Sequence, residues 1–140
     1  MSEVPVAVSR LGKDDSREAQ NARAVRWLLA QAGGLVVVVT PRRAVSSEII
    51  NRLITRPEVQ HHAWRGFTGG YFNGQRVLYA WPDRKHLNEV WNVEADAIAV
   101  IEWGIEETAE WVEDVNPIQL LPGQTIEPTA PERVTVEPLS

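Results

Sequence analysis

The chain has 140 residues, of which 44% are hydrophobic and 24% charged, so it is long enough for one folded domain and is neither a disordered nor a collagen-like sequence. It contains no cysteine, which excludes disulfides, zinc–thiolate sites and a thiol nucleophile. The apolar run Leu35–Val39 is far shorter than the about 20 residues of a membrane span, and no basic-then-apolar leader opens the chain, so the expected location is the cytoplasm or a virion assembled there.

The net charge of −5 is unevenly distributed along the chain. Residues 1–100 contain 13 Lys and Arg against 10 Asp and Glu, whereas residues 101–140 contain 1 against 9. Because contacts with phosphate need Lys and Arg, the acidic third of the chain is not expected to face a nucleic acid. The stretch Arg42–Lys85, with eight basic and three acidic residues, leaves a local anion-binding surface open.

The first half of the chain predicts two strands, each followed by a helix. Leu35–Val39 is a continuous apolar run, which is typical of a strand covered on both faces in a parallel sheet. Asp15 and Glu18 have the spacing of a capping box, with Asp15 as the expected N-cap, and apolar residues then recur at helical spacing. The expected elements are strand 4–8, helix 15–32, strand 35–39 and helix 46–56.

The second half continues the alternation of strands and helices. In the last expected helix, Ile105, Ala109 and Val112 would form one buried stripe, opposite a solvated acidic face. The alternation predicts an α/β three-layer domain with a mostly parallel sheet, P-loop- or Rossmann-like in layout, with extended arms at both ends. The expected elements are strand 62–67, strand 76–81, a short helix from 83, strand 95–102 and a helix from 105.

The composition changes at Pro117, and five prolines, Pro117 included, lie among Thr, Glu and Val from there to the end of the given sequence. We therefore expect three parts: residues 1–14 as an N-terminal arm or a first short strand and loop, 15–116 as the α/β domain, and 117–140 as a Pro-rich acidic extended tail. Val134 and Val136 alternate with polar residues, so the tip of this tail is a candidate to add as a strand to another chain's sheet.

Two predicted strands end in a proline followed by arginine, in the sequences TPRR (40–43) and WPDR (81–84). In open α/β sheets ligands bind beyond the carboxyl ends of the strands, so this edge is a candidate crevice for an anion or a nucleotide. The alternative interpretation is that the prolines begin helices and the arginines are solvated. The candidate ligand-binding residues are Lys13, Thr40, Arg42, Arg43, Arg84, Lys85 and Glu102.

Five short motifs follow one another in a recognisable order: AVSRLGKD (7–14), TPRRAV (40–45), GG (69–70), WPDR (81–84) and VIEWG (100–104). In this order they resemble the phosphate-binding loop, the PTRELA-type, GG and TPGR-type motifs, and the magnesium-binding DEAH-type motif in the first domain of superfamily-2 helicases. The resemblance implies a P-loop NTPase fold, with Gly12-Lys13 at the phosphates and Glu102 at the magnesium ion.

Three residues depart from that pattern. Ala7 replaces the first glycine of the phosphate loop, and Asp14 replaces the Ser or Thr whose hydroxyl binds magnesium. Glu102 is the one acid left of the acidic pair. ATP hydrolysis is therefore not expected, and no cofactor is implied. No metal is implied either, because His61 and His62 are adjacent on a predicted strand and would point to opposite faces.

These observations favour a non-catalytic α/β association module, such as a phage or bacterial accessory or assembly protein that contacts a protein partner or a second copy of itself. Trp103 and Trp111 border the acidic helix and are candidate interface anchors alongside Val134 and Val136, although core packing is the alternative for both tryptophans. The competing hypothesis is a nucleotide- or nucleic-acid-associated protein that binds phosphate at the arginine-rich edge. No membrane partner is expected.

Overall fold

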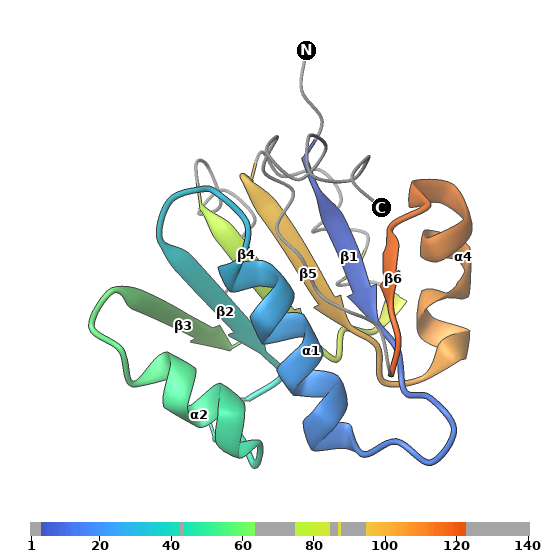
Figure 1. Cartoon of the computed structure of the whole chain (residues 1–140), viewed down its shortest axis with the longest axis horizontal. Helices are drawn as coiled ribbons and strands as arrows, with labels where there is room; N and C mark the ends of the chain where they lie inside the picture. The colour runs from blue at the N-terminus through green and yellow to red at the C-terminus, as the bar shows by residue number, and fades with distance from the viewer. Residues whose placement is uncertain (1–3, 43, 64–74, 85–86, 88–94, 123–140) are drawn as a thin grey trace, which may run out of the picture.

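Six parallel strands form a single sheet in the order β3-β2-β4-β5-β1-β6 (Figure 1). The computed structural model describes residues 4–42, 44–63, 75–84, 87 and 95–122. The expected α/β domain with a mostly parallel sheet is confirmed. The strands are β1 (Val6–Ser9), β2 (Val36–Thr40), β3 (Val59–Ala63), β4 (Arg76–Ala80), β5 (Ala97–Ile101) and β6 (Ile118–Leu120), and the helices are α1 (Arg17–Leu29), α2 (Glu48–Ile54) and α4 (Ile105–Val115).

The central strands are buried on both faces, which explains their continuous apolar sequences. All five residues of β2 and of β5 are buried. Alternate residues of each strand enter two separate cores: Val36 and Val38 pack with α1 and α2 on one face, whereas Val37 and Val39 join a second core that includes Trp111 of α4. Figure 1 shows α1 and α2 in front of the sheet and α4 beside β6.

The sheet includes segments that the sequence analysis assigned to the arms. Of the two alternatives for residues 1–14, strand β1 forms, and it lies inside the sheet between β5 and β6. The expected boundary at residue 116 is too early, because Ile118–Leu120 form the edge strand β6 and pair with β1 in the register Ala7↔Ile118. Leu120 is 4% exposed in the α1-side core, so this strand completes the domain. The rest of the expected tail, from residue 123, lies outside the described residues.

Two helices differ from expectation in how their side chains are used. The N-cap of α1 is Ser16 rather than Asp15, and its side chain accepts a hydrogen bond from the Ala19 N–H. In α4 the inward face carries Thr108 and Trp111, whereas Ile105 is 62% exposed and the predicted stripe is wrong. At α1 the Asp15 carboxylate is engaged by Arg23 and by the Gly12 and Ser16 N–H groups, so Ser16 caps the helix. At α4 the position of the sheet decides which face of the helix is buried.

Several expected segments extend beyond the part of the chain that the structure describes. Strand β3 begins at Val59, and the remainder of the expected strand 62–67 falls after Ala63 among the undescribed residues, as does most of the helix expected from 83. Among the helices that are described, none has the length and apolar character needed to cross a membrane.

Candidate ligand pocket at the carboxyl edge of the sheet

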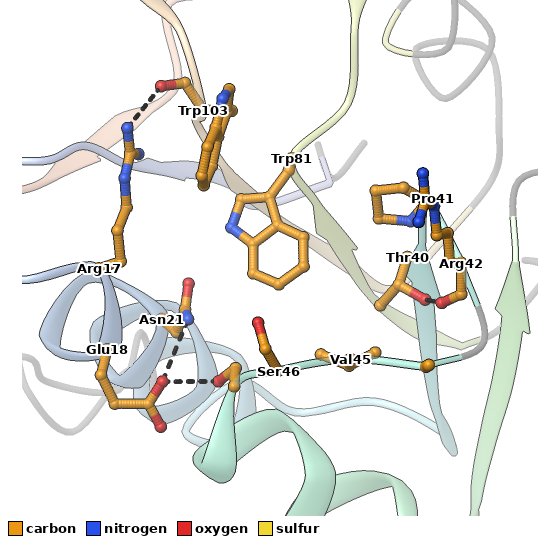
Figure 2. A pocket seen from close by; sticks show the side chains of 12 residues that line it. Arg17, Glu18, Asn21, Thr40, Pro41, Arg42, Val45, Ser46, Trp81 and Trp103 are labelled. Atoms are coloured by element: carbon orange, nitrogen blue, oxygen red, sulfur yellow. Dashed lines mark hydrogen bonds between the residues drawn. The ribbon is translucent and has the colours of Figure 1, made fainter.

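A pocket of about 730 Å³ lies at the carboxyl ends of the strands, between the first turns of α1 and α2. Its walls come from four places in the chain: the start of α1, the loop after β2, the residue that follows β4, and the residues that follow β5. Figure 2 shows these side chains converging on one space. The lining residues are Arg17, Glu18, Asn21, Thr40, Pro41, Arg42, Ala44, Val45, Ser46, Ser47, Trp81 and Trp103.

Trp103 and Trp81 form the aromatic wall of the pocket. Their ring centroids are 6.3 Å apart and the planes meet at 76°, an edge-to-face arrangement. The Arg17 guanidinium lies 4.1 Å from the Trp103 ring centroid and donates to the carbonyl oxygens of Glu102 (3.2 Å) and Trp103 (3.1 Å). Trp103 is nevertheless 57% exposed, so a large aromatic surface remains available at the mouth of the pocket.

Trp81 reaches the pocket through an unusual backbone conformation. Its φ is 53°, in the left-handed region, where a bulky side chain costs on the order of 1–3 kcal/mol. Its N–H donates to the Ile101 carbonyl oxygen at 2.9 Å, which holds the strained residue against the end of β5. Strain of this kind persists where the surrounding structure imposes it, and it is concentrated at functional sites.

Glu18 connects α1 to the start of α2 beneath the pocket. One carboxylate oxygen accepts from the Ser47 hydroxyl at 2.8 Å, and the other accepts from the Ile49 N–H at 2.7 Å. Partial desolvation raises the pKa of the Glu18 carboxyl, but the hydrogen bonds that it accepts lower the pKa by more, so the net pKa lies below the usual value. The carboxylate is therefore ionised at neutral pH and acts only as an acceptor.

Thr40 and Arg42 are the predicted site residues that line the pocket together with Trp103. The Thr40 hydroxyl donates to the Arg42 carbonyl oxygen at 2.5 Å and lies 2.7 Å from Nε2 of His61, so it is already committed. Arg42 is exposed, and within the described residues its guanidinium makes no hydrogen bond or ion pair. Arg42 is thus a cation at the pocket that remains available to an anionic ligand.

The loop between β1 and α1, where the helicase resemblance places a phosphate, already contains an anion. The Asp15 carboxylate accepts from the Gly12 N–H at 3.0 Å and the Ser16 N–H at 2.9 Å. Arg23 neutralises it at 2.5 Å, and this pair is almost fully buried. These two N–H groups are therefore not available to phosphate, and Lys13 is exposed in the same loop without lining the pocket.

Glu102 is likewise engaged within the fold. It is 7% exposed and receives two hydrogen bonds from Arg10, at 3.1 and 3.0 Å, and one from the Thr108 hydroxyl. This arrangement ties the end of β5 to β1 and α4. Because three donors already occupy its two oxygens, Glu102 acts here as a structural acceptor and does not line the pocket.

The remaining predicted site residues do not join this pocket. Arg84 docks onto α4, where its side chain donates to the Glu106 carbonyl oxygen at 2.9 Å. Trp111 is 6% exposed within the second core, so the core-packing alternative holds and it offers no surface to a partner. Four predicted residues lie outside the described part of the chain, namely Arg43, Lys85, Val134 and Val136.

None of the three residues that α1 contributes to the pocket was predicted from the sequence: Arg17, Glu18 and Asn21. They occupy the first turns of α1, and their spacing of one and four residues places them on neighbouring parts of the helix surface. This polar start of the helix after β1 was the one available signal. In the described residues no group of three or more His, Asp or Glu side chains is arranged to hold a metal ion.

Comparison of the chain with protein-family models, with curated proteins and with solved structures finds no match in any of the three. Functional inference therefore rests on the geometry of the pocket itself.

Proposed function

We propose that this protein binds a nucleotide unit, either free or within a single-stranded nucleic acid, in the pocket at the carboxyl edge and does not hydrolyse it. The observation that carries the proposal is the combination of two tryptophan rings with an unengaged guanidinium in one pocket. Aromatic side chains stack on bases, and arginine pairs with phosphate, so this combination matches both halves of a nucleotide.

The local charge supports an anionic ligand even though the whole chain is acidic. Arg17 and Arg42 both line the pocket, and in the described residues neither guanidinium contacts a carboxylate. The opposing charge is Glu18, whose oxygens are occupied by donors from the start of α2. We infer the absence of hydrolysis from Asp15 and Glu102. Asp15 occupies the N–H groups of Gly12 and Ser16, and Arg10 holds both carboxylate oxygens of Glu102.

Tryptophan fluorescence during titration with mononucleotides and eight-residue oligonucleotides tests the proposal. We expect Arg42→Glu to weaken binding at least about tenfold, since it replaces an attraction to phosphate by a repulsion. Arg56→Glu is the matched control, because this exposed residue after α2 makes the same charge change without lining the pocket. Tighter, salt-dependent binding of the oligonucleotide would identify a strand as the ligand; no binding in wild type, or equal loss in both variants, would refute the proposal.

A protein-association function is the second candidate, and one specific observation favours it. Trp103 and Ile105 are 57% and 62% exposed and lie two residues apart at the start of α4. Large exposed apolar side chains of this kind are enriched at protein interfaces. Sedimentation over a range of concentrations, with Ile105→Lys as the variant, separates the two candidates, because a concentration-dependent mass that this variant abolishes supports association.

A further inference from the structure

Within the part of the chain that the structure describes, two residues of the pocket each carry a buried polar atom without a hydrogen-bond partner: Oδ1 of Asn21, an acceptor, and Nε1 of Trp81, a donor. Asn21 is 2% exposed as a whole residue. A buried polar group that lacks a partner costs about 1–3 kcal/mol, so such groups are rare unless a ligand or water completes them. Asn21 and Trp81 both line the pocket, and each therefore contributes one unpaired polar group to it.

The chemistry of Glu18 fixes which atom of the Asn21 amide is left unpaired. The Asn21 Nδ2 donates to Glu18 Oε1 at 3.4 Å. Rotating the amide by half a turn would set its oxygen against a carboxylate that can only accept, so the observed orientation is the favourable one. Since Ser47 and Ile49 hold Glu18 in turn, the start of α2 keeps the Asn21 oxygen directed away from Glu18. Figure 2 shows this oxygen on the side of the amide that faces the Trp81 indole.

The Trp81 donor is held as firmly as the Asn21 acceptor. Its backbone is bonded to Ile101, its φ is fixed at 53°, and its ring meets Trp103 edge to face. Neither atom can therefore find a protein partner by a simple rotation of its side chain. A ligand that carries a donor beside an acceptor would complete both.

We propose that Asn21 Oδ1 and Trp81 Nε1 together read the hydrogen-bonding edge of a nucleobase. The base N–H would donate to Asn21, while the neighbouring base nitrogen or carbonyl oxygen would accept from Trp81. This assignment rests on the proposed function. It adds to the stacking of the base on tryptophan two hydrogen bonds that only an unmodified base edge can form. Glu18 is then a positioning residue, which acts through Asn21 and does not touch the base.

Nucleotides with a blocked edge provide the test without altering the protein. N6,N6-dimethyl-AMP and 3-methyl-UMP keep the ring and phosphate of AMP and UMP but lack the donor hydrogen at the edge. We expect wild type to bind whichever parent nucleotide it accepts about five- to tenfold more tightly than its blocked analogue, as loss of one buried hydrogen bond predicts. Equal affinities would mean that water alone completes the two atoms, and the assignment would be wrong.

Two variants test which side chain distinguishes the parent nucleotide from its blocked analogue. Asn21→Leu removes the acceptor that the base N–H needs, so this variant should bind parent and blocked nucleotides within about twofold of each other. Trp81→Phe keeps an aromatic wall but removes the donor, so it should weaken the parent nucleotide about five- to tenfold while the preference for parent over blocked nucleotide remains. Trp111→Phe is the matched control: among the described residues its indole Nε1 is also buried and without a partner, but it lies in the other core and should leave the affinity for the parent nucleotide unchanged.

The outcomes separate this assignment from the proposed function. If wild type binds nucleotides without discriminating the blocked edge, the proposed function stands and the assignment fails. If Asn21→Leu still prefers the parent nucleotide as wild type does, or if Trp111→Phe weakens binding as much as Trp81→Phe, the effect is not local to these two atoms and the assignment also fails. If wild type binds no nucleotide at all, both are wrong.

Discussion

Replacing Asp15 by Asn is expected to destabilise the fold through Arg23. The two side chains form an ion pair at 2.5 Å and are 4% and 6% exposed, respectively. Removing the carboxylate charge leaves the Arg23 guanidinium buried with a carbonyl oxygen of Arg10 and a neutral amide as partners. Breaking a buried pair from one side costs about 3–5 kcal/mol, so we expect the free energy of unfolding of Asp15→Asn to fall by about 3 kcal/mol at pH 7.

The pH dependence makes this prediction specific to the carboxylate. Its hydrogen bond with Arg23 lowers the pKa of Asp15 from 3.8 to about 2. A lowered pKa in the folded state stabilises the protein above the unfolded-state value, and that stabilisation is lost as pH falls through the folded value. The pKa shift of Asp15 corresponds to about 2.5 kcal/mol of stabilisation at neutral pH, and about half of this stabilisation is lost by pH 3. The stability gap between wild type and Asp15→Asn should therefore narrow by about 1 kcal/mol between pH 7 and pH 3.

Urea unfolding at pH 7, 5, 4 and 3, followed by circular dichroism, measures the gap directly. Comparing the two proteins at each pH removes the contribution of the other carboxyl groups, which titrate in both. Glu48→Gln is the control, because its ion pair with Arg52 is 73–78% exposed and should contribute no more than about 0.5 kcal/mol. A gap below about 1 kcal/mol at pH 7, or one that stays constant down to pH 3, would refute the role assigned to this pair.

Two further predictions concern stability. Ser47→Ala removes the cap of α2 and a hydrogen-bond partner of Glu18, so it should lower the free energy of unfolding by about 1–2 kcal/mol in the same urea assay. A loss below about 0.3 kcal/mol, as small as that of an ordinary surface substitution, would contradict the coupling of the two helices. Deleting residues 124–140 should change the free energy of unfolding by less than about 1 kcal/mol, whereas deleting residues 117–140 should lower it by at least about 2 kcal/mol because this removes β6 and its buried Leu120. Thermal melting of both truncated proteins, at a concentration where they are monomeric, measures the difference. Equal melting temperatures would show that β6 does not contribute to stability.

The class of fold was predictable from the amino-acid sequence. The runs Val36–Val39 in β2 and Ala97–Ile101 in β5 are continuously apolar and rich in β-branched residues, as is typical of a strand that is covered on both faces. Gly33-Gly34 follows α1 and Pro57 follows α2, and these residue types favour the end of a helix. The carboxyl edge was also predictable as a candidate site, because parallel strands bring the loops that follow them to one side of the sheet. Thr40 and Arg42 were found in this way.

Which side chains meet depends on the packing of elements that are distant in the chain. Asn21 and Trp81 are sixty positions apart in the sequence. They line one pocket only because α1 packs on the sheet to which β4 belongs. Long-range packing also directs the Glu18 carboxylate to the start of α2 instead of back to its own helix. It makes β6 part of the sheet, although an alternation of only three residues is too short to predict a strand. Local sequence encodes the period and the ends of an element, whereas the partners of its polar side chains depend on neighbours that are distant in the chain.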